Sequence, residues 1–251
     1  MNPSTLEEAQ DLFNFTKNEY AKISTNYELV ICPPFIYLEE ISKMLNSPDP
    51  RYAGFDLVKL GAQDIFWESA GAYTGEISSN MLKNFRISHV LVGHSDRRYV
   101  IGETDEIINR KVKATLLAGL TPVLLVGERE INDIRENILT DQLSRDLKDL
   151  TPERIAKTIF VYEPVWAIST REHGHADTPE NAVAAIQILN DILIKSFRIP
   201  SPVPVFYGGS VNESNIEAFL NRPEIGGVVI GAASLRKDEF GRILKLVSLI
   251  R

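Results

Sequence analysis

A histidine and a glutamate each stand directly after a run of apolar residues, where the end of a buried strand would turn them towards a ligand. His94 follows Val-Leu-Val-Gly, and Glu163 follows Ile-Phe-Val-Tyr and precedes Pro-Val-Trp. A carboxylate in apolar surroundings loses hydration, which makes it a stronger base. A neutral imidazole can donate a hydrogen bond to a carbonyl and polarise it. From the residues alone, Glu163 could act as a base and His94 could polarise a carbonyl.

Both residues also have an ordinary structural interpretation. A lone glutamate at a strand end is more often paired with a cation, and a lone histidine is more often a satisfied structural residue. Ser95 is expected to cap the N-terminus of a helix, whose positive end would favour the uncharged form of His94. The apolar neighbours of Glu163 shift the balance towards the catalytic interpretation.

Two turns of small residues near the end of the chain predict a phosphate site. Residues 207–211 read Tyr-Gly-Gly-Ser-Val and residues 231–235 read Gly-Ala-Ala-Ser-Leu, each after an apolar run. Small side chains let backbone amides approach a phosphate group. These segments predict a phosphorylated small molecule that is held by amides and faces His94 and Glu163.

Seven short apolar runs, separated by helical patterns, must position these residues. Such alternation predicts β-α units around a parallel sheet, with the active site at the carboxyl ends of the strands. The runs are residues 29–32, 58–62, 90–93, 123–127, 159–162, 203–207 and 227–230. Before the first run lies only a helical stretch, residues 5–23. We expect a single β/α barrel domain over residues 1–251 with its first strand missing.

Composition and charge exclude several other classes of protein. The chain has 251 residues, 44% of them hydrophobic, and a formal charge of −7. A broad nucleic-acid surface is disfavoured because phosphate backbones need clustered basic residues. Neither a membrane span of about 18 apolar residues nor a signal peptide is evident, and the single cysteine, Cys32, cannot form an intramolecular disulfide. We expect a soluble cytoplasmic protein that binds neither nucleic acid nor membranes.

Motifs spread along nearly the whole chain resemble those of the triosephosphate isomerase family and occur in the family's order. They are Cys-Pro-Pro at 32–34, Gly-Ala-Gln-Asp at 61–64, Gly-Ala-Tyr-Thr-Gly-Glu-Ile-Ser at 71–78, and the segments 93–98, 162–168, 207–211 and 231–235. The resemblance implies the α/β class and a TIM (β/α)8 barrel, of which this chain shows seven strands.

The resemblance implies reversible interconversion of dihydroxyacetone phosphate and glyceraldehyde 3-phosphate, without cofactor or metal. It makes Glu163 the base and His94 the donor to the enediolate oxygens. Residues 164–170 and beyond resemble a lid that excludes water. The remaining assignments are Ser169, Ser210, Gly231 and Ala232 at the phosphate, Ser95, Asp96 and Arg97 in support of the catalytic pair, and Thr74 in a loop that enters the partner subunit of a homodimer.

The beginning of the chain departs from the family pattern. The family's first strand ends Asn-Trp-Lys-Met-Asn, and Met1 and Asn2 match its last two residues. The motif's catalytic lysine, which places a charge beside the substrate's phosphate and carbonyl, has no counterpart here, so turnover is expected to suffer. We expect that the gene product begins upstream and that an internal methionine has been taken as the start. The alternative is a degenerate homologue, a non-catalytic phosphosugar-binding barrel.

Milder departures lie around the phosphate and in the lid. Asp96 stands where many relatives have glutamate, which shortens the side chain but keeps its charge. Ser169 and Ala232 replace glycines, and their amides stay available provided that their φ angles are not positive. The far side of the lid, residues 171–177, is longer than usual, so its closing kinetics are expected to differ.

Two polar segments invite a functional interpretation that we set aside. His173, His175 and Asp177 alternate along the chain as metal ligands can, but a solvated turn is the better interpretation of this glycine-containing loop. Residues 128–130 read Glu-Arg-Glu after an apolar run, and we expect them to form an exposed, ion-paired loop that contributes little to stability.

Overall fold

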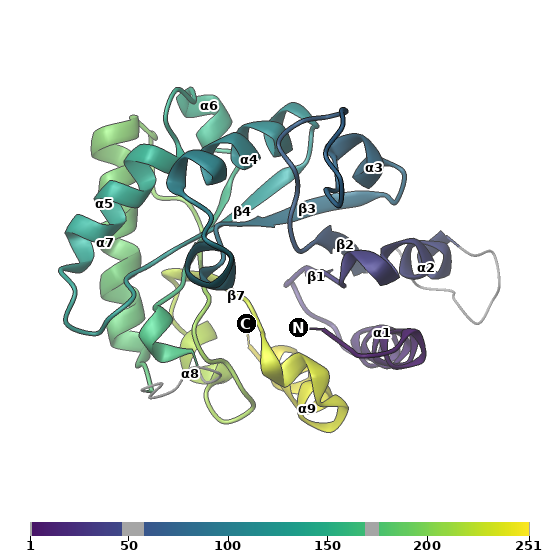
Figure 1. Cartoon of the computed structure of the whole chain (residues 1–251). Helices are drawn as coiled ribbons and strands as arrows, with labels where there is room; N and C mark the ends of the chain where they lie inside the picture. Colours follow the sequence, from purple (N-terminus) through teal and green to yellow (C-terminus); the bar gives the residue numbers. More distant parts are fainter. Residues whose placement is uncertain (1, 47–57, 169–175, 251) are drawn as a thin grey trace.

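The apolar runs form one parallel sheet. A computed structural model of the chain describes residues 2–46, 58–168 and 176–250. Its seven strands are hydrogen-bonded in chain order, each parallel to the next, which confirms the predicted α/β class and strand number (Figure 1). They are β1 (Leu29–Ile31), β2 (Val58–Ala62), β3 (Ile87–Val92), β4 (Thr121–Val126), β5 (Ile159–Tyr162), β6 (Val205–Tyr207) and β7 (Ile225–Val228).

Some strand boundaries differ from the predicted ones. β3 begins at Ile87 rather than Val90, because Ser88 and His89 continue the extended backbone although they are polar. β6 begins at Val205, directly after Pro204, which lacks the N–H needed for pairing. In all seven strands the carboxyl ends lie at one edge of the sheet, because the pairing is parallel throughout.

Helices connect the strands and cover the outside of the sheet. They are α1 (Leu6–Tyr20), α2 (Phe35–Asn46), α3 (Ser79–Lys83), α4 (Asp105–Leu117), α5 (Arg135–Asp146), α6 (Pro152–Ile155), α7 (Pro179–Phe197), α8 (Ile216–Leu220) and α9 (Lys237–Val247). The start of α7 is well capped: the Thr178 hydroxyl accepts from the Asn181 amide, and Pro179 occupies the first turn. Within the described residues, no helix is both long and apolar enough to span a membrane.

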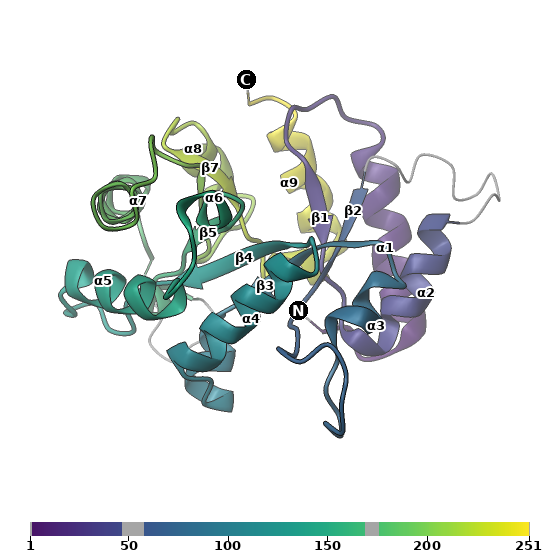
Figure 2. The same ribbon diagram turned by 90° about the horizontal axis from the view of Figure 1, so that it is seen from above.

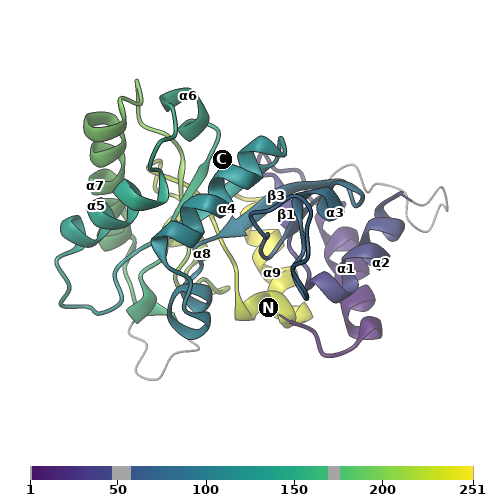
Figure 3. The ribbon, with the colours of Figure 1, turned by 45° about the horizontal axis from the view of Figure 1, so that its top comes forward.

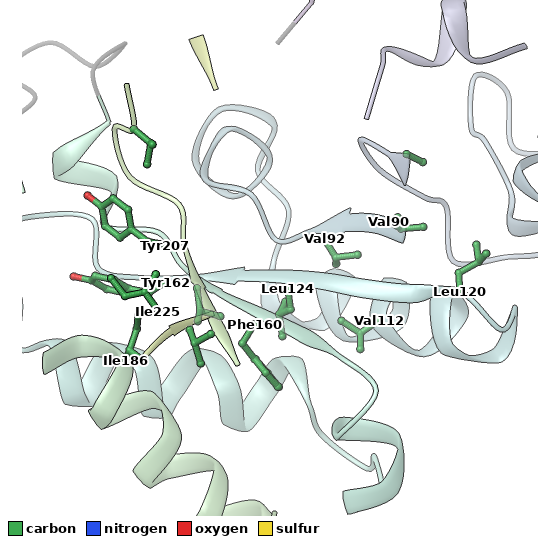
Figure 4. Close-up of a cluster of buried hydrophobic side chains, with 14 of the residues drawn as sticks. Val90, Val92, Val112, Leu120, Leu124, Phe160, Tyr162, Ile186, Tyr207 and Ile225 are labelled. Atoms are coloured by element: carbon green, nitrogen blue, oxygen red, sulfur yellow. The ribbon is translucent and has the colours of Figure 1, made fainter. Parts of the chain in front are cut away.

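Alternate strand residues enter two different apolar clusters. Leu124, Phe160 and Tyr162 pack with helix residues such as Val112 and Ile186 between sheet and helices (Figure 4). A smaller cluster of strand residues, centred on Val123, Leu125 and Val161, fills the opposite face of the sheet. Because successive side chains of a strand point to opposite faces, continuous apolar runs supply both clusters.

The two edges of the sheet approach each other without joining. Figures 1 and 2 show β1 and β7 at the ends of a curved sheet, and within the described residues they do not pair. On the outside, however, α1 packs against α9, so the helical layer continues across this opening. Figure 3 shows α5 and α7 at the opposite end of the molecule from α1 and α2. The architecture is a half-barrel consistent with a TIM barrel.

Candidate active site

The ends of β3 and β5 bring His94 and Glu163 together. His94 follows β3, and Glu163 is the first residue after β5. Their side chains approach to 3.3 Å between Nε2 of His94 and Oε1 of Glu163. Residues nearly seventy positions apart are neighbours here because both strands end at the same edge of the sheet.

Ser95 holds the Glu163 carboxylate with two hydrogen bonds. The Ser95 amide donates to Oε2 at 2.9 Å, and the hydroxyl donates to Oε1 at 3.1 Å. The predicted N-cap role of Ser95 is wrong, because the hydroxyl is used on Glu163 and the helical turn at Arg97–Ile101 has Asp96 at its cap without a side-chain bond. Ser95 is completely buried, so these bonds are shielded from water.

The backbone of the same turn determines which ring nitrogen carries the proton in the neutral form of His94. The Asp96 amide donates to Nδ1 of His94 at 3.1 Å. An Nδ1 that accepts a hydrogen bond carries no proton, so the neutral ring has its proton on Nε2. Nε2 is the atom that faces Glu163, and in this arrangement it is a hydrogen-bond donor. The tautomer of His94 follows from a backbone amide rather than from a helix capped by Ser95.

Burial makes Glu163 a stronger base than an ordinary glutamate. Its side chain is 3% exposed, and loss of hydration raises the pKa of its carboxyl. His94 and the two hydrogen bonds from Ser95 act in the opposite direction and lower this pKa. The effect of burial is the largest, so the pKa of Glu163 is raised overall.

The backbone of Glu163 is fixed against the end of β4. Its amide donates to the Val126 carbonyl at 2.8 Å, continuing the pairing of β4 with β5. Gly127 lies so close that a Cβ atom there would stand 2.1 Å from the Glu163 carbonyl oxygen. Glycine is required at position 127 for this approach.

Asp96 and Arg97 flank the catalytic pair in different ways. The Asp96 carboxylate is exposed and lies 3.7 Å from Nδ1 of His94. Arg97 forms ion pairs with Asp64 at 2.9 Å and with Glu103 at 2.6 Å. The buried ammonium of Lys111 joins the same two carboxylates. This cluster anchors the turn that carries His94.

The predicted phosphate turns follow neighbouring strands. β6 and β7 pair, so Ser210 and Gly231 follow strands that end side by side. The Ser210 amide donates to the Ala167 carbonyl at 3.3 Å, which ties this turn to the segment after Glu163. Ala232 begins a short 3-10 turn and is not among the residues with a positive φ angle. Its amide therefore meets the condition that we set for replacing a glycine at the phosphate. Ser169 lies outside the described residues.

The segment after Glu163 is anchored by Glu128. Val165–Ala167 form a 3-10 turn, and Nε1 of Trp166 donates to Oε1 of Glu128 at 3.1 Å. Tyr162 and Arg135 also donate to this oxygen, at 2.7 and 3.0 Å. Glu128 is 1% exposed, so the prediction of an exposed loop is wrong at this residue. The sequence analysis did not weigh the tyrosine and tryptophan that bind it.

The other assignments fall on the surface or outside the described part. Thr74 is exposed in the loop between β2 and α3. His173 and His175 are not among the described residues, whereas Asp177 accepts from the Thr178 amide and the Asn181 side chain. Within the described residues, no group of three or more histidine, cysteine or acidic side chains could hold a metal ion.

Comparison with known proteins agrees with this geometry. The family model described as triosephosphate isomerase matches residues 1–247. The triosephosphate isomerase of Dictyoglomus thermophilum is 40% identical over 235 residues, which cover 90% of each chain. The chain belongs to the triosephosphate isomerase family. The triosephosphate isomerase of Geobacter metallireducens is 39% identical over 88% of this chain and 86% of its own length. The triosephosphate isomerase of Dehalococcoides mccartyi strain BAV1 is 39% identical over 99% of this chain and 94% of its own length.

Membership of the triosephosphate isomerase family makes the chain an isomerase and explains the half-barrel. The sequence analysis missed two buried residues near the site, Glu128 and Arg98. Glu128 is the second residue after β4 and Glu163 is the first residue after β5, so an acidic side chain so close to a strand end could have drawn attention to it. Arg98 had no such signal, because its partners are backbone carbonyls and distant carboxylates.

Proposed function

We propose that this chain interconverts dihydroxyacetone phosphate and glyceraldehyde 3-phosphate through an enediolate. The observation that carries the proposal is the buried Glu163 carboxylate beside Nε2 of His94, whose Nδ1 accepts from the Asp96 amide. One group can take a proton from carbon while the other donates to the neighbouring oxygen. The family name of the relatives, triosephosphate isomerase, supports the same reaction.

In the proposed reaction, Glu163 removes a proton from C1 of dihydroxyacetone phosphate. The electron pair of the broken C–H bond forms the C1–C2 double bond, and negative charge develops on the C2 oxygen, to which His94 donates. Nε2 of His94 gives its proton to the C2 oxygen and recovers one from the C1 hydroxyl, whose O–H electron pair forms the C1 carbonyl. The electron pair of the C1–C2 double bond then takes the proton back from Glu163 at C2. Atoms and electrons balance without a cofactor or a metal ion.

The phosphate of the substrate is assigned to the backbone amides after β6 and β7. Ser210, Gly231 and Ala232 offer small-residue turns at neighbouring strand ends, and Ser169 would contribute from the lid segment. Neutral amides suit an acidic chain, because they bind the anion locally without a basic surface. Closure of the lid segment over the enediolate would exclude water.

The given 251 residues hold no counterpart of the lysine in the family motif, so their turnover is expected to be weak. A coupled assay of isomerase activity on this chain, and on a form extended by the residues encoded upstream, tests that expectation. Activity in the extended form alone would support the proposal. Absence of isomerase activity in both forms, with binding of glycerol 3-phosphate still detected by calorimetry, would instead favour a non-catalytic phosphosugar-binding barrel.

The role of Glu163 is tested in the more active of the two forms. Glu163→Gln keeps the shape of the side chain but removes the base, and kcat should fall by at least about 100-fold. Glu130→Gln is the matched control, because Glu130 is an exposed glutamate that pairs with Arg129. Equal activity of the two variants would contradict the assignment of Glu163.

A homodimer in the cytoplasm is the proposed state of the protein. The loop that carries Thr74 is pinned at its base by the Phe66 amide, which donates to the Ile77 carbonyl at 2.8 Å. Its tip exposes Tyr73, which is 45% accessible and packs in a tilted arrangement against Phe66. An exposed aromatic residue on a pinned loop suits insertion into a second copy of the chain.

A further inference from the structure

Arg98 is buried beside the site, and each of its three side-chain nitrogens donates a hydrogen bond. Its side chain is 7% exposed. Nε donates to the Gly93 carbonyl at 2.7 Å, and Nη2 donates to the Leu125 carbonyl at 3.0 Å. Two carboxylates complete the set, with Asp105 at 2.7 Å from Nη1 and Asp146 at 2.6 Å from Nη2. One planar group thus joins four acceptors in fixed directions.

The two carbonyls belong to the strand ends that carry the reacting groups. Gly93 immediately precedes His94, and the backbone amide of Arg98 also donates to the His94 carbonyl at 3.0 Å. Leu125 precedes Val126, whose carbonyl receives the Glu163 amide. Arg98 therefore spans the end of β3, which holds the electrophile, and the end of β4, against which the base is fixed.

The contact between Arg98 and Gly93 leaves no room for a side chain. Gly93 has a φ of +76°, and a Cβ there would lie 2.7 Å from Nη2 of Arg98 and 2.9 Å from the Leu125 carbonyl oxygen. The turn and the guanidinium fit each other only with glycine at this position. The geometry of the His94 turn is thus coupled directly to the placement of the guanidinium.

The carboxylates hold the guanidinium from the side away from the strands. Asp146 ends α5 and its side chain is fully buried, while Asp105 begins α4. The Asn109 side chain of α4 donates to the Asp146 carbonyl at 2.9 Å, so the two helices are tied together at this point. The charge of Arg98 is balanced there, and its direction towards the strand ends is fixed.

We propose that Arg98 is a positioning residue for the isomerisation, which sets His94 and Ser95 relative to Glu163 through the ends of β3 and β4. The proposal rests on the proposed function. Arg98 does not touch the substrate position itself; it acts through the carbonyls of Gly93, His94 and Leu125. Its guanidinium is needed because an ammonium cannot direct donors to four acceptors in one plane.

Arg98→Lys is the test variant, because it keeps a positive charge beside Asp146 and loses the planar fork. Arg145→Lys is the matched control: Arg145 lies 3.6 Å from the same Asp105 but is 58% exposed, and within the described residues its side chain makes no hydrogen bond to either strand end. Both are made in the more active form of the chain. The readouts are kcat and KM, and the exchange rate of the Ser95 amide proton by NMR.

For Arg98→Lys we expect kcat to fall by about 10- to 100-fold with KM little changed, since a small misplacement of reacting groups costs rate rather than binding. The Ser95 amide should exchange faster, because its bond to Glu163 is loosened. Arg145→Lys should change neither quantity. Equal kcat values in the two variants, or a loss confined to KM, would overturn the proposal.

Two further measurements distinguish failure of this proposal from misfolding of the variant and from failure of the proposed function. If Arg98→Lys does not fold, Asp146→Asn replaces it, because the amide is nearly isosteric and weakens only the outer anchor of the guanidinium; the same changes are expected at smaller size. If the parent protein shows no isomerase activity, the proposed function fails. The exchange rate of the Ser95 amide still reports whether Arg98 holds the ends of β3 and β4 in place. Unchanged exchange in Arg98→Lys would then overturn the positioning role.

Discussion

At the scale of single residues, the site depends on opposing influences on one carboxyl group. Burial raises the pKa of Glu163, whereas His94 and Ser95 lower it. A base must be ionised to take a proton, and it is stronger when its pKa is higher. Ser95 therefore keeps a buried carboxylate usable, with an amide and a hydroxyl that both donate to it.

The acid side of the pH profile should report this balance. Because the pKa of Glu163 is raised, kcat/KM should fall with decreasing pH starting above the ordinary glutamate value of about 4.3. Ser95→Ala removes one donor to the ionised form, so it should move this fall to still higher pH. The substrate phosphate titrates identically with both proteins, which makes the comparison internally controlled. A fall at the same pH in both would show that the hydroxyl does not tune Glu163.

At the scale of elements, close backbone approaches join the strand ends. β4 and β5 meet at Gly127, where the Glu163 carbonyl leaves no space for a Cβ atom. β3 and β4 meet through Arg98. The turn after β3 is further tied to β2 and α4 by the cluster of Arg97, Asp64 and Lys111.

Gly127→Ala should damage both stability and catalysis. The new methyl group must displace the Glu163 backbone, at a cost of about 1–3 kcal/mol in the free energy of unfolding, and kcat should fall with it. Gly119→Ala is the control for catalysis: its φ of +77° makes alanine costly for stability, but open space surrounds it at the far end of β4, so kcat should be retained. Urea unfolding and the coupled assay measure both. A Gly127→Ala protein with normal kcat would contradict the contact between Gly127 and the base.

Lys111→Met should be strongly destabilising. It would leave Asp64 and Glu103 with only Arg97 as a cation, and breaking a buried ion pair costs about 3–5 kcal/mol. Lys113→Met, on the same helix, removes a partly exposed pair with Asp149 at 3.7 Å and should cost less than about 1 kcal/mol. Equal unfolding free energies for the two variants would show that the buried cluster adds nothing.

At the scale of the whole molecule, the half-barrel has two sheet edges and one exposed loop that bear on assembly. β1 and β7 leave unpaired backbone at the edges within the described residues, although α1 and α9 cover the outside. Unpaired edges invite contacts with other chains. The Thr74 loop stands away from this opening, between β2 and α3 (Figure 1).

Sedimentation should therefore separate dimerisation through the loop from association of sheet edges. We expect a mass twice that of one chain, and Thr74→Arg should shift the protein towards monomer because a charge would be buried in the interface. Ser201→Arg adds the same charge at an exposed site after α7 and should leave the mass unchanged. A dimer insensitive to Thr74→Arg would contradict the assignment of this loop.

Sequence alone predicted the strands and the meeting of His94 with Glu163 at the strand ends, because both follow from apolar runs and the residues directly after them. It could not predict the use of Ser95, since a serine after a strand can cap a helix or bind a neighbouring side chain, and only the approach of β5 decides. The burial of Glu128 and Arg98 depends on partners from distant elements. Long-range packing of this kind leaves no local pattern in the sequence.

The central claim, proton transfer by Glu163, is tested most directly by the reaction in deuterated water. With dihydroxyacetone phosphate as substrate, a carboxylate that exchanges its proton with solvent should place deuterium on C2 of glyceraldehyde 3-phosphate, detected by NMR. Glu163→Gln should abolish both turnover and deuterium incorporation, whereas Glu130→Gln should preserve both. Product formed by the parent enzyme without deuterium, together with undiminished turnover in Glu163→Gln, would contradict the account.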